Sequence, residues 1–172
     1  MSFPKQKFRE MILQCLYALQ LYQDNSSSMT SLLMKELKAS KKNVLLAQEK
    51  SLTIIEDIKE LDLIIDNISQ LFRIENMQLV DLNILRLATY EMINEKDIPG
   101  KIIIAEGMRL ANKFSSKESV AFINALLDSL FKKYRETEKL EENASSPVSS
   151  EESVKPLEVD DSEIQDITYP QA

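Results

Sequence analysis

The amino-acid sequence predicts an all-α protein of six or seven helices. Apolar residues recur at steps of three and four through most of the chain, which is the period of a helix with one buried face. Residues that interrupt helices are scarce, because the 172 residues include only 2 glycines and 5 prolines, and neither type occurs between Pro4 and Pro99. An apolar content of 44% suits a folded domain with a core of its own.

The N-terminal half predicts three or four helices. The first is expected at about 4–23, where Pro4 suits the first helical turn. Apolar residues between 29 and 37 predict a second, shorter helix, and Ser40 is a candidate cap for a third. Apolar character then continues to about residue 73, over a stretch that fits either one long helix or two.

The C-terminal half predicts three further helices. The segment at about 78–95 is apolar on most sides, which predicts a position near the centre of the bundle. Pro99 and Gly100 end it, and 101–114 keeps helical spacing although 102–104 is β-branched and has no partner strand. Ser115 and Glu118 have the spacing of a capping box, which predicts the start of the last helix.

Acidic residues are concentrated at the C-terminus. The net charge is −7, but residues 136–172 hold 11 acidic and 2 basic residues, whereas 1–135 hold 17 acidic and 19 basic ones. The segment is also rich in serine and poor in aromatic residues, so it cannot bury enough apolar surface to offset ordering. We therefore expect one folded domain over 1–135 and a disordered acidic tail over 136–172, which either adds solubility or competes with nucleic acid for the mildly basic domain.

The composition argues against catalysis. The chain has no histidine, which excludes imidazole acid–base chemistry, and it has no glycine-rich phosphate loop. Its one cysteine, Cys15, lies on the apolar side of the first helix and is expected to be a core residue. No signal-peptide pattern or membrane-length apolar run is present. These observations predict a cytoplasmic binding protein that is not an enzyme and needs no cofactor or metal.

Two segments are candidates for nucleic-acid binding. Lys5, Lys7 and Arg9 lie at the start of the first helix, where cations and free backbone N–H groups can contact phosphates. Three basic residues at a helix start are more often a solvated face. The junction at 112–119 adds two lysines and several hydroxyls, with Phe122 and Asn124 close behind. An aromatic ring beside an amide suits single-stranded RNA, and the alternative for Phe122 is a core aromatic.

Several ordered motifs resemble the NusB family of bacterial transcription factors. The resemblance covers about 5–133 and is densest over 79–128. The segments that carry it are Arg9-Glu10, QCLY at 14–17, DLNILRLATYE at 81–91, DIPGK at 97–101, LANKF at 110–114 and SVAFINALLD at 119–128.

The resemblance implies two packed three-helix subdomains, at about 1–75 and 76–135. It also implies an antitermination factor that binds the boxA element of ribosomal RNA leader transcripts together with a small-subunit ribosomal protein, NusE. Such a factor joins an RNA polymerase complex and supports processive transcription of ribosomal RNA operons. A homodimer is a further assembly that the resemblance allows.

The resemblance also implies roles for particular residues. RNA contacts would come from Lys5, Lys7, Arg9, Lys113, Lys117, Ser119, Phe122 and Asn124. Contacts with the ribosomal protein would come from Tyr17, Glu75, Asp81 and Glu118. Internal polar struts would be Arg86, Tyr90 and Glu106.

The sequence departs from the family pattern at several of these places. Lysines replace most of the N-terminal arginines, Ser115 and Ala125 replace two glycines, and Ala105 replaces an asparagine. Lysine binds phosphate as a point charge without the planar fork of arginine, so we expect weak, salt-sensitive RNA binding by the isolated protein. Two alternatives are a helical module that binds only proteins and a stand-alone relative of the NusB-like domain of ribosomal RNA methyltransferases.

Overall fold

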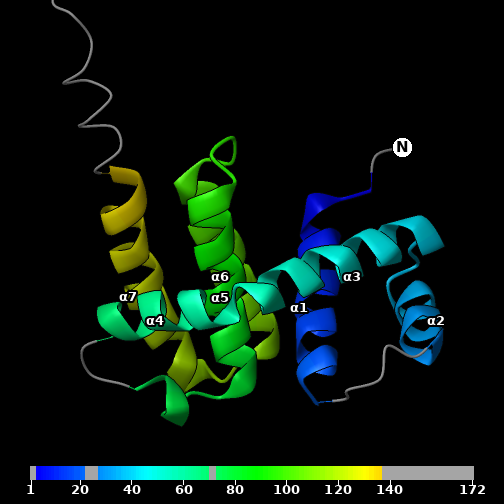
Figure 1. Ribbon diagram of the computed structural model, residues 1–172, viewed down its shortest axis with the longest axis horizontal. Coiled ribbons are helices and arrows are strands. Elements are labelled where there is room, and N and C mark those ends of the chain that lie inside the picture. Colours follow the sequence, from blue (N-terminus) through cyan, green and yellow to red (C-terminus); the bar gives the residue numbers. More distant parts are fainter. Residues whose placement is uncertain (1–2, 22–26, 70–72, 137–172) are drawn as a thin grey trace, which may run out of the picture.

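The computed structural model describes residues 3–21, 27–69 and 73–136, and it confirms the predicted all-α class. Over these residues the chain forms seven α-helices and no strand (Figure 1). None of the described helices is both long enough and apolar enough to cross a lipid bilayer. The α-helices are α1 (Lys5–Leu21), α2 (Ser27–Glu36), α3 (Lys41–Glu56), α4 (Ile58–Ile68), α5 (Leu79–Asn94), α6 (Gly100–Phe114) and α7 (Lys117–Phe131).

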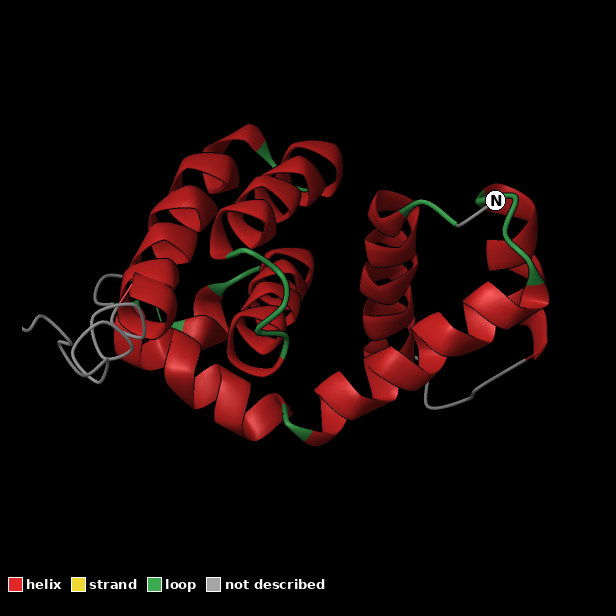
Figure 2. Ribbon diagram, turned by 90° about the horizontal axis from the view of Figure 1, so that it is seen from above, coloured by secondary structure: helices red, strands yellow, loops and turns green. Residues whose placement is uncertain are grey.

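The stretch that fitted one helix or two forms two, α3 and α4. Ser40 caps α3 as predicted, because its hydroxyl accepts a hydrogen bond from the backbone N–H of Asn43. The two helices meet at Asp57, whose backbone N–H closes the last turn of α3. Seen from above, they follow one another along a single edge of the molecule (Figure 2).

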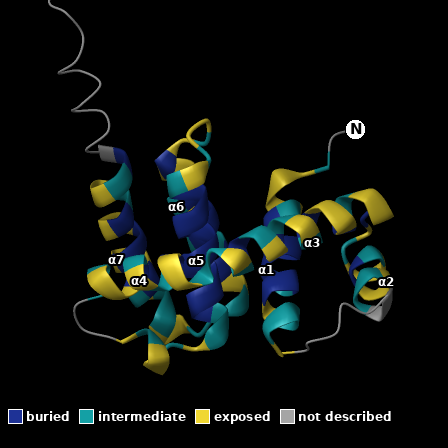
Figure 3. Cartoon of the chain, in the orientation of Figure 1, coloured by how far each residue is buried: buried dark blue, intermediate teal, exposed yellow. Residues whose placement is uncertain are grey.

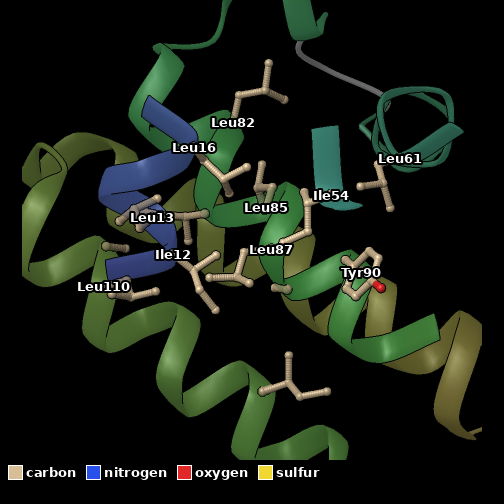
Figure 4. Close-up of a cluster of buried hydrophobic side chains, with 14 of the residues drawn as sticks. Ile12, Leu13, Leu16, Ile54, Leu61, Leu82, Leu85, Leu87, Tyr90 and Leu110 are labelled. Atoms are coloured by element: carbon tan, nitrogen blue, oxygen red, sulfur yellow. The ribbon is translucent and has the colours of Figure 1, made fainter. Parts of the chain in front are cut away.

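Helix α5 is the central element, as its apolar pattern predicted. All its residues from 81 to 92 are buried, and it packs against α1, α3, α4, α6 and α7 (Figure 3). The side chains around it form one core, which α1, α3, α4 and α6 also supply (Figure 4). Helix α4 belongs to the proposed N-terminal subdomain, but it packs on α5 and α7 of the proposed C-terminal one. The division into subdomains at 75/76 therefore stays a proposal.

Helices α6 and α7 pack closely at Gly107, which has no side chain. A Cβ atom on Gly107 would lie 2.8 Å from Leu127 Cδ1, which is closer than carbon atoms approach without a shift. Leu127 is fully buried and has little room to move. The run at 102–104 is helical, as its spacing predicted, and Ile103 is buried in the core.

The predicted capping box at the start of α7 is wrong by one residue. The N-cap is Ser116, whose hydroxyl accepts from the backbone N–H of Ser119 at 3.2 Å. Ser115 instead ends α6, and its hydroxyl donates to the carboxylate of Asp81. Spacing alone could not separate two adjacent serines, because the choice depends on which one meets a partner from α5.

The described chain ends in a short π-helix, Lys132–Glu136, which Arg135 ties to the fold. The Arg135 guanidinium donates to the backbone carbonyls of Glu95, Lys96 and Ile98, in the connection from α5 to α6. Arg135 is 9% exposed, so packing against the fold continues to this residue, and the domain boundary at 135/136 stays a proposal. Apart from Glu136, the predicted tail lies outside the described residues.

Candidate functional site

The three cations at the start of α1 have different environments. Lys5 and Lys7 are exposed. Arg9 is 6% exposed, and its Nε atom donates to Glu91 Oε1 at 2.8 Å and to Oε2 at 3.1 Å. Burial raises the pKa of Glu91, and the neighbouring Arg9 charge limits that rise. The guanidinium of Arg9 therefore neutralises a buried carboxylate and has little surface left for a phosphate.

Helix α1 is joined to α6 by a second group of ion pairs. Glu10 accepts from Arg109, and its Oε2 atom lies 2.7 Å from Lys113 Nζ. Burial alone would raise the pKa of Glu10, but hydrogen bonds from Lys113 and Arg109 hold it below its ordinary value. Arg109 also donates to Glu106 and to the backbone carbonyl of Gln6.

These pairs bring the two predicted RNA-binding segments together. Lys113, in the last turn of α6, reaches Glu10 in the second turn of α1, while its side chain stays 52% exposed. Its ammonium also lies 5.2 Å from the centre of the Phe114 ring. The start of α1 and the end of α6 are thus adjacent, although about a hundred residues separate them in the sequence.

The remaining predicted RNA contacts lie in the first two turns of α7. Lys117 and Asn124 are exposed, and Ser119 is half-buried beside its cap, Ser116. Phe122 is half-buried and packs against the core. Its ring therefore contributes to packing even if part of its surface also contacts a ligand.

The predicted partner-binding residues are more scattered. Tyr17 is 43% exposed and lines an apolar cavity of about 430 Å³, together with Leu32, Val80 and Phe114. Asp81, one residue beyond Val80, is 4% exposed, and its carboxylate holds Ser115 rather than facing solvent.

Two further predicted partner contacts are acidic and exposed. Glu75 lies in a short 3₁₀ helix, Ile74–Asn76, and Glu118 lies in the first turn of α7. Hydrogen bonds from its own backbone N–H and from Ser116 lower the pKa of the Glu118 carboxyl. Its charge also suits the positive end of α7.

Arg86 is an internal strut, as predicted, and its carboxylate partner is Asp62 on α4. Its Nε and Nη2 atoms donate to the two carboxylate oxygens of Asp62, at 2.6 and 2.7 Å. Its Nη1 atom donates to Gln20 and Asn83. One guanidinium therefore links α1, α4 and α5.

The other two predicted struts also lie inside the fold. Tyr90 is 8% exposed, and Lys50 Nζ lies 4.3 Å from the centre of its ring. Glu106 accepts from Gln6 and Arg109. Sequence reasoning missed Arg109, although its position three residues after Glu106 is a recognised signal for a helical ion pair.

The structure offers no further chemistry at Cys15, which is fully buried. Burial raises the pKa of its thiol to about 12, so the thiol is neutral at physiological pH. Across the ranges 3–21, 27–69 and 73–136, no three of the residue types that bind metals are grouped to hold an ion.

Comparisons with known proteins agree with the motifs. The family model described as the NusB family matches residues 6–132. A transcription antitermination protein NusB from Chlamydia pneumoniae is 42% identical over 130 residues, which cover 76% of this chain and 81% of the relative. One of the same description from Clostridium perfringens is 34% identical over 128 residues, which cover 73% of this chain and 95% of the relative. The solved structure of T. maritima NusB matches with a TM-score of 0.67 and 28% identity, over 82% of this chain and 99% of that one.

Proposed function

The chain belongs to the NusB family of transcription antitermination proteins, and from this premise we propose that it binds boxA-type RNA together with NusE. In this role it would join the RNA polymerase antitermination complex on ribosomal RNA leader transcripts. We also propose that it is a cytoplasmic factor without catalytic activity.

The observation that carries the RNA proposal is the junction between α1 and α6. The ion pair between Glu10 and Lys113 and the bond from Arg109 to the Gln6 carbonyl hold the two helices together there. Lys5 and Lys7 are exposed at the start of α1, and Lys117 and Asn124 are exposed on α7, which follows directly after α6. Cations near an exposed amide suit a single strand whose phosphates and bases are bound side by side.

The structure also supports dependence on the ribosomal protein. Arg9 already neutralises Glu91, and Lys113 is already paired with Glu10, so fewer cations are free than the sequence suggested. Each phosphate contact that is missing lowers affinity at physiological salt. The apolar cavity beside Tyr17 is a place where a protein partner could supply the remaining binding energy.

A titration tests the RNA proposal. Labelled boxA RNA is titrated with the full chain, alone and with NusE, at two salt concentrations, and anisotropy is measured. We expect weak binding alone, tighter binding with NusE, and a steep loss of affinity with salt. Phe122→Ala should weaken binding by roughly tenfold, because stacking on one base is worth about 1–3 kcal/mol.

Phe122→Leu separates stacking from packing. Leucine keeps most of the apolar contact with the core but has no ring, so the variant should fold normally and still bind RNA weakly. If Phe122→Leu binds as well as the unaltered chain, and only Phe122→Ala loses helicity and affinity together, Phe122 is a core aromatic. Absence of RNA binding even with NusE would overturn the proposal and favour a helical module that binds only proteins.

A second titration tests the protein face in the absence of RNA. Tyr17→Ala removes an aromatic ring from the rim of the cavity and should weaken NusE binding by about tenfold or more, as expected for a tyrosine at the centre of an interface. Leu63→Ala is the matched control, because Leu63 is a 63% exposed apolar residue on α4. Calorimetry measures both affinities, and equal effects of the two changes would remove Tyr17 from the interface.

A further inference from the structure

Four lysines are gathered where α2 passes into α3. Lys35 lies in the last turn of α2, Lys38 in the connection, and Lys41 and Lys42 in the first turn of α3. All four side chains are exposed, and Glu36 is the only acidic residue among them. None of the residues predicted to bind RNA or NusE lies in this segment, which we call the α2–α3 lysine cluster.

The four lysines of the cluster differ from the paired cations of the fold in having no internal partner. Lys113, Arg9 and Arg86 neutralise carboxylates of the fold, and Lys50 pairs with Glu95. By contrast, none of the four cluster lysines forms an ion pair with any residue of the described ranges. Their charges are therefore fully available to an external anion.

The fold gains nothing evident from lysines at these positions. The start of a helix carries a partial positive charge and favours acidic residues, but the first turn of α3 has lysines and no acid. Lys38 has a φ of 49°, in the left-handed region where glycine is the least strained residue. Folding alone would favour other residues at three of the four sites.

The connection itself is held firmly. The backbone N–H of Ala39 donates to the carbonyl of Met34, and Leu33 and Ala39 are buried beneath it. Ser40 caps α3 immediately afterwards. The lysines thus project from an anchored turn, so binding an anion there needs little ordering of the backbone.

The cluster also lies at the first turn of α3, a helix that packs against α1. Figure 1 places the start of α3 and the start of α1 along the same upper edge of the molecule, and Figure 3 shows exposed residues at both. A strand bound at Lys5 and Lys7 could therefore continue toward the cluster. Resting on the proposed function, we propose that the α2–α3 lysine cluster binds backbone phosphates of RNA that flanks the boxA element.

RNA is the occupant that the charges favour. Lysine ammonium groups bind phosphates as point charges without reading bases, so the cluster would add affinity but no sequence preference. An acidic protein surface and the chain's own acidic segment at 136–172 are the competing occupants. Each predicts a different result in the following test.

The test compares two double variants of the full chain. Lys41→Gln/Lys42→Gln removes two charges from the cluster. Lys59→Gln/Lys101→Gln removes two exposed lysines on α4 and α6 and is the matched control. Anisotropy measures the affinity of each protein, with NusE present, for boxA RNA alone and for boxA RNA extended by about ten nucleotides on each side, which exceeds the span of a short single-strand site.

We expect Lys41→Gln/Lys42→Gln to weaken binding of the extended RNA by about tenfold at low salt and to leave binding of boxA alone unchanged. The slope of log affinity against log salt should fall by about 1.4, since each phosphate contact on a single strand contributes about 0.7. The control should change neither value. Circular dichroism and thermal melting check that both variants fold.

Three results would overturn the inference. The first is equal affinity of the cluster variant and the control for the extended RNA, while boxA alone still binds, which leaves the proposed function intact. The second is tighter RNA binding by the cluster variant, which would mean that the acidic segment occupies the cluster. The third is a cluster variant whose only defect is weaker binding of NusE, measured without RNA, which would identify the cluster as a protein contact. Failure of the unaltered chain to bind boxA at all would refute the proposed function and this inference with it.

Discussion

Replacing Arg9 by methionine should lower the free energy of unfolding by about 3–5 kcal/mol, which is the usual effect of removing one partner of a buried ion pair. Methionine fills a similar volume but leaves the Glu91 carboxylate, whose side chain is 6% exposed, without the Arg9 Nε–H that donates to both its oxygens. Urea denaturation followed by circular dichroism measures the change.

The loss of unfolding free energy in Arg9→Met should depend on pH. Burial already raises the pKa of Glu91 above its ordinary value, and loss of the Arg9 charge raises it further. A carboxyl whose pKa is higher in the folded state than in the unfolded state stabilises the fold at low pH and loses that contribution as the pH rises through the folded-state pKa. The difference between the variant and the unaltered chain should therefore be larger at about pH 7.5 than at about pH 5.

Lys7→Met is the matched control for Arg9→Met. Lys7 is exposed two residues earlier on the same helix, so its replacement should change stability by less than about 0.5 kcal/mol. It should instead weaken RNA binding and reduce its dependence on salt. A variant Arg9→Met that is as stable as the unaltered chain but binds RNA poorly would contradict the structural role and return Arg9 to the RNA-binding surface.

Replacing Arg86 by methionine should cost about 3 kcal/mol of stability. The change leaves the carboxylate of Asp62 without two hydrogen bonds and removes a donor from Gln20 and Asn83. The Asp62 side chain is 21% exposed, so water can replace part of what is lost, and the effect lies at the lower end of the range for buried pairs.

Arg86→Lys distinguishes the geometry of this link from its charge. Lysine keeps the positive charge but cannot donate to both oxygens of Asp62 while also reaching Gln20. We expect it to recover about half of the stability lost in Arg86→Met. Urea denaturation measures the change, and the dependence of the unfolding free energy on urea concentration should be the same for both variants. Full recovery would mean that charge alone matters at this position.

The positions of most helices could be predicted from the sequence to within a few residues. Scarce glycine and proline and a period near 3.6 determine them locally, so α5 was found to within a residue or so and predicted to be central. The break at Asp57 could not be predicted, because apolar residues continue on both sides of it and only the packing of α4 on α5 and α7 requires a change of direction.

The candidate surfaces were harder to predict than the helices. The motifs identified the family, but a motif does not tell whether a charged residue faces solvent or another helix. Arg9, Lys113 and Asp81 were all interpreted as binding residues, and each has an internal partner. The α2–α3 lysine cluster belongs to no motif, and its lack of partners became visible only in the structure.

The sequence by itself thus determined the all-α class, the central place of α5 and membership of the NusB family, because each depends on local periodicity or on the order of motifs. The tertiary structure decided which charges remain available for binding. An ion pair such as Arg9 with Glu91 joins residues that are 82 positions apart, and its existence depends on how α1 crosses α5. Burial then makes that pair structural, since a buried charge without its partner costs more than a phosphate contact at the surface returns.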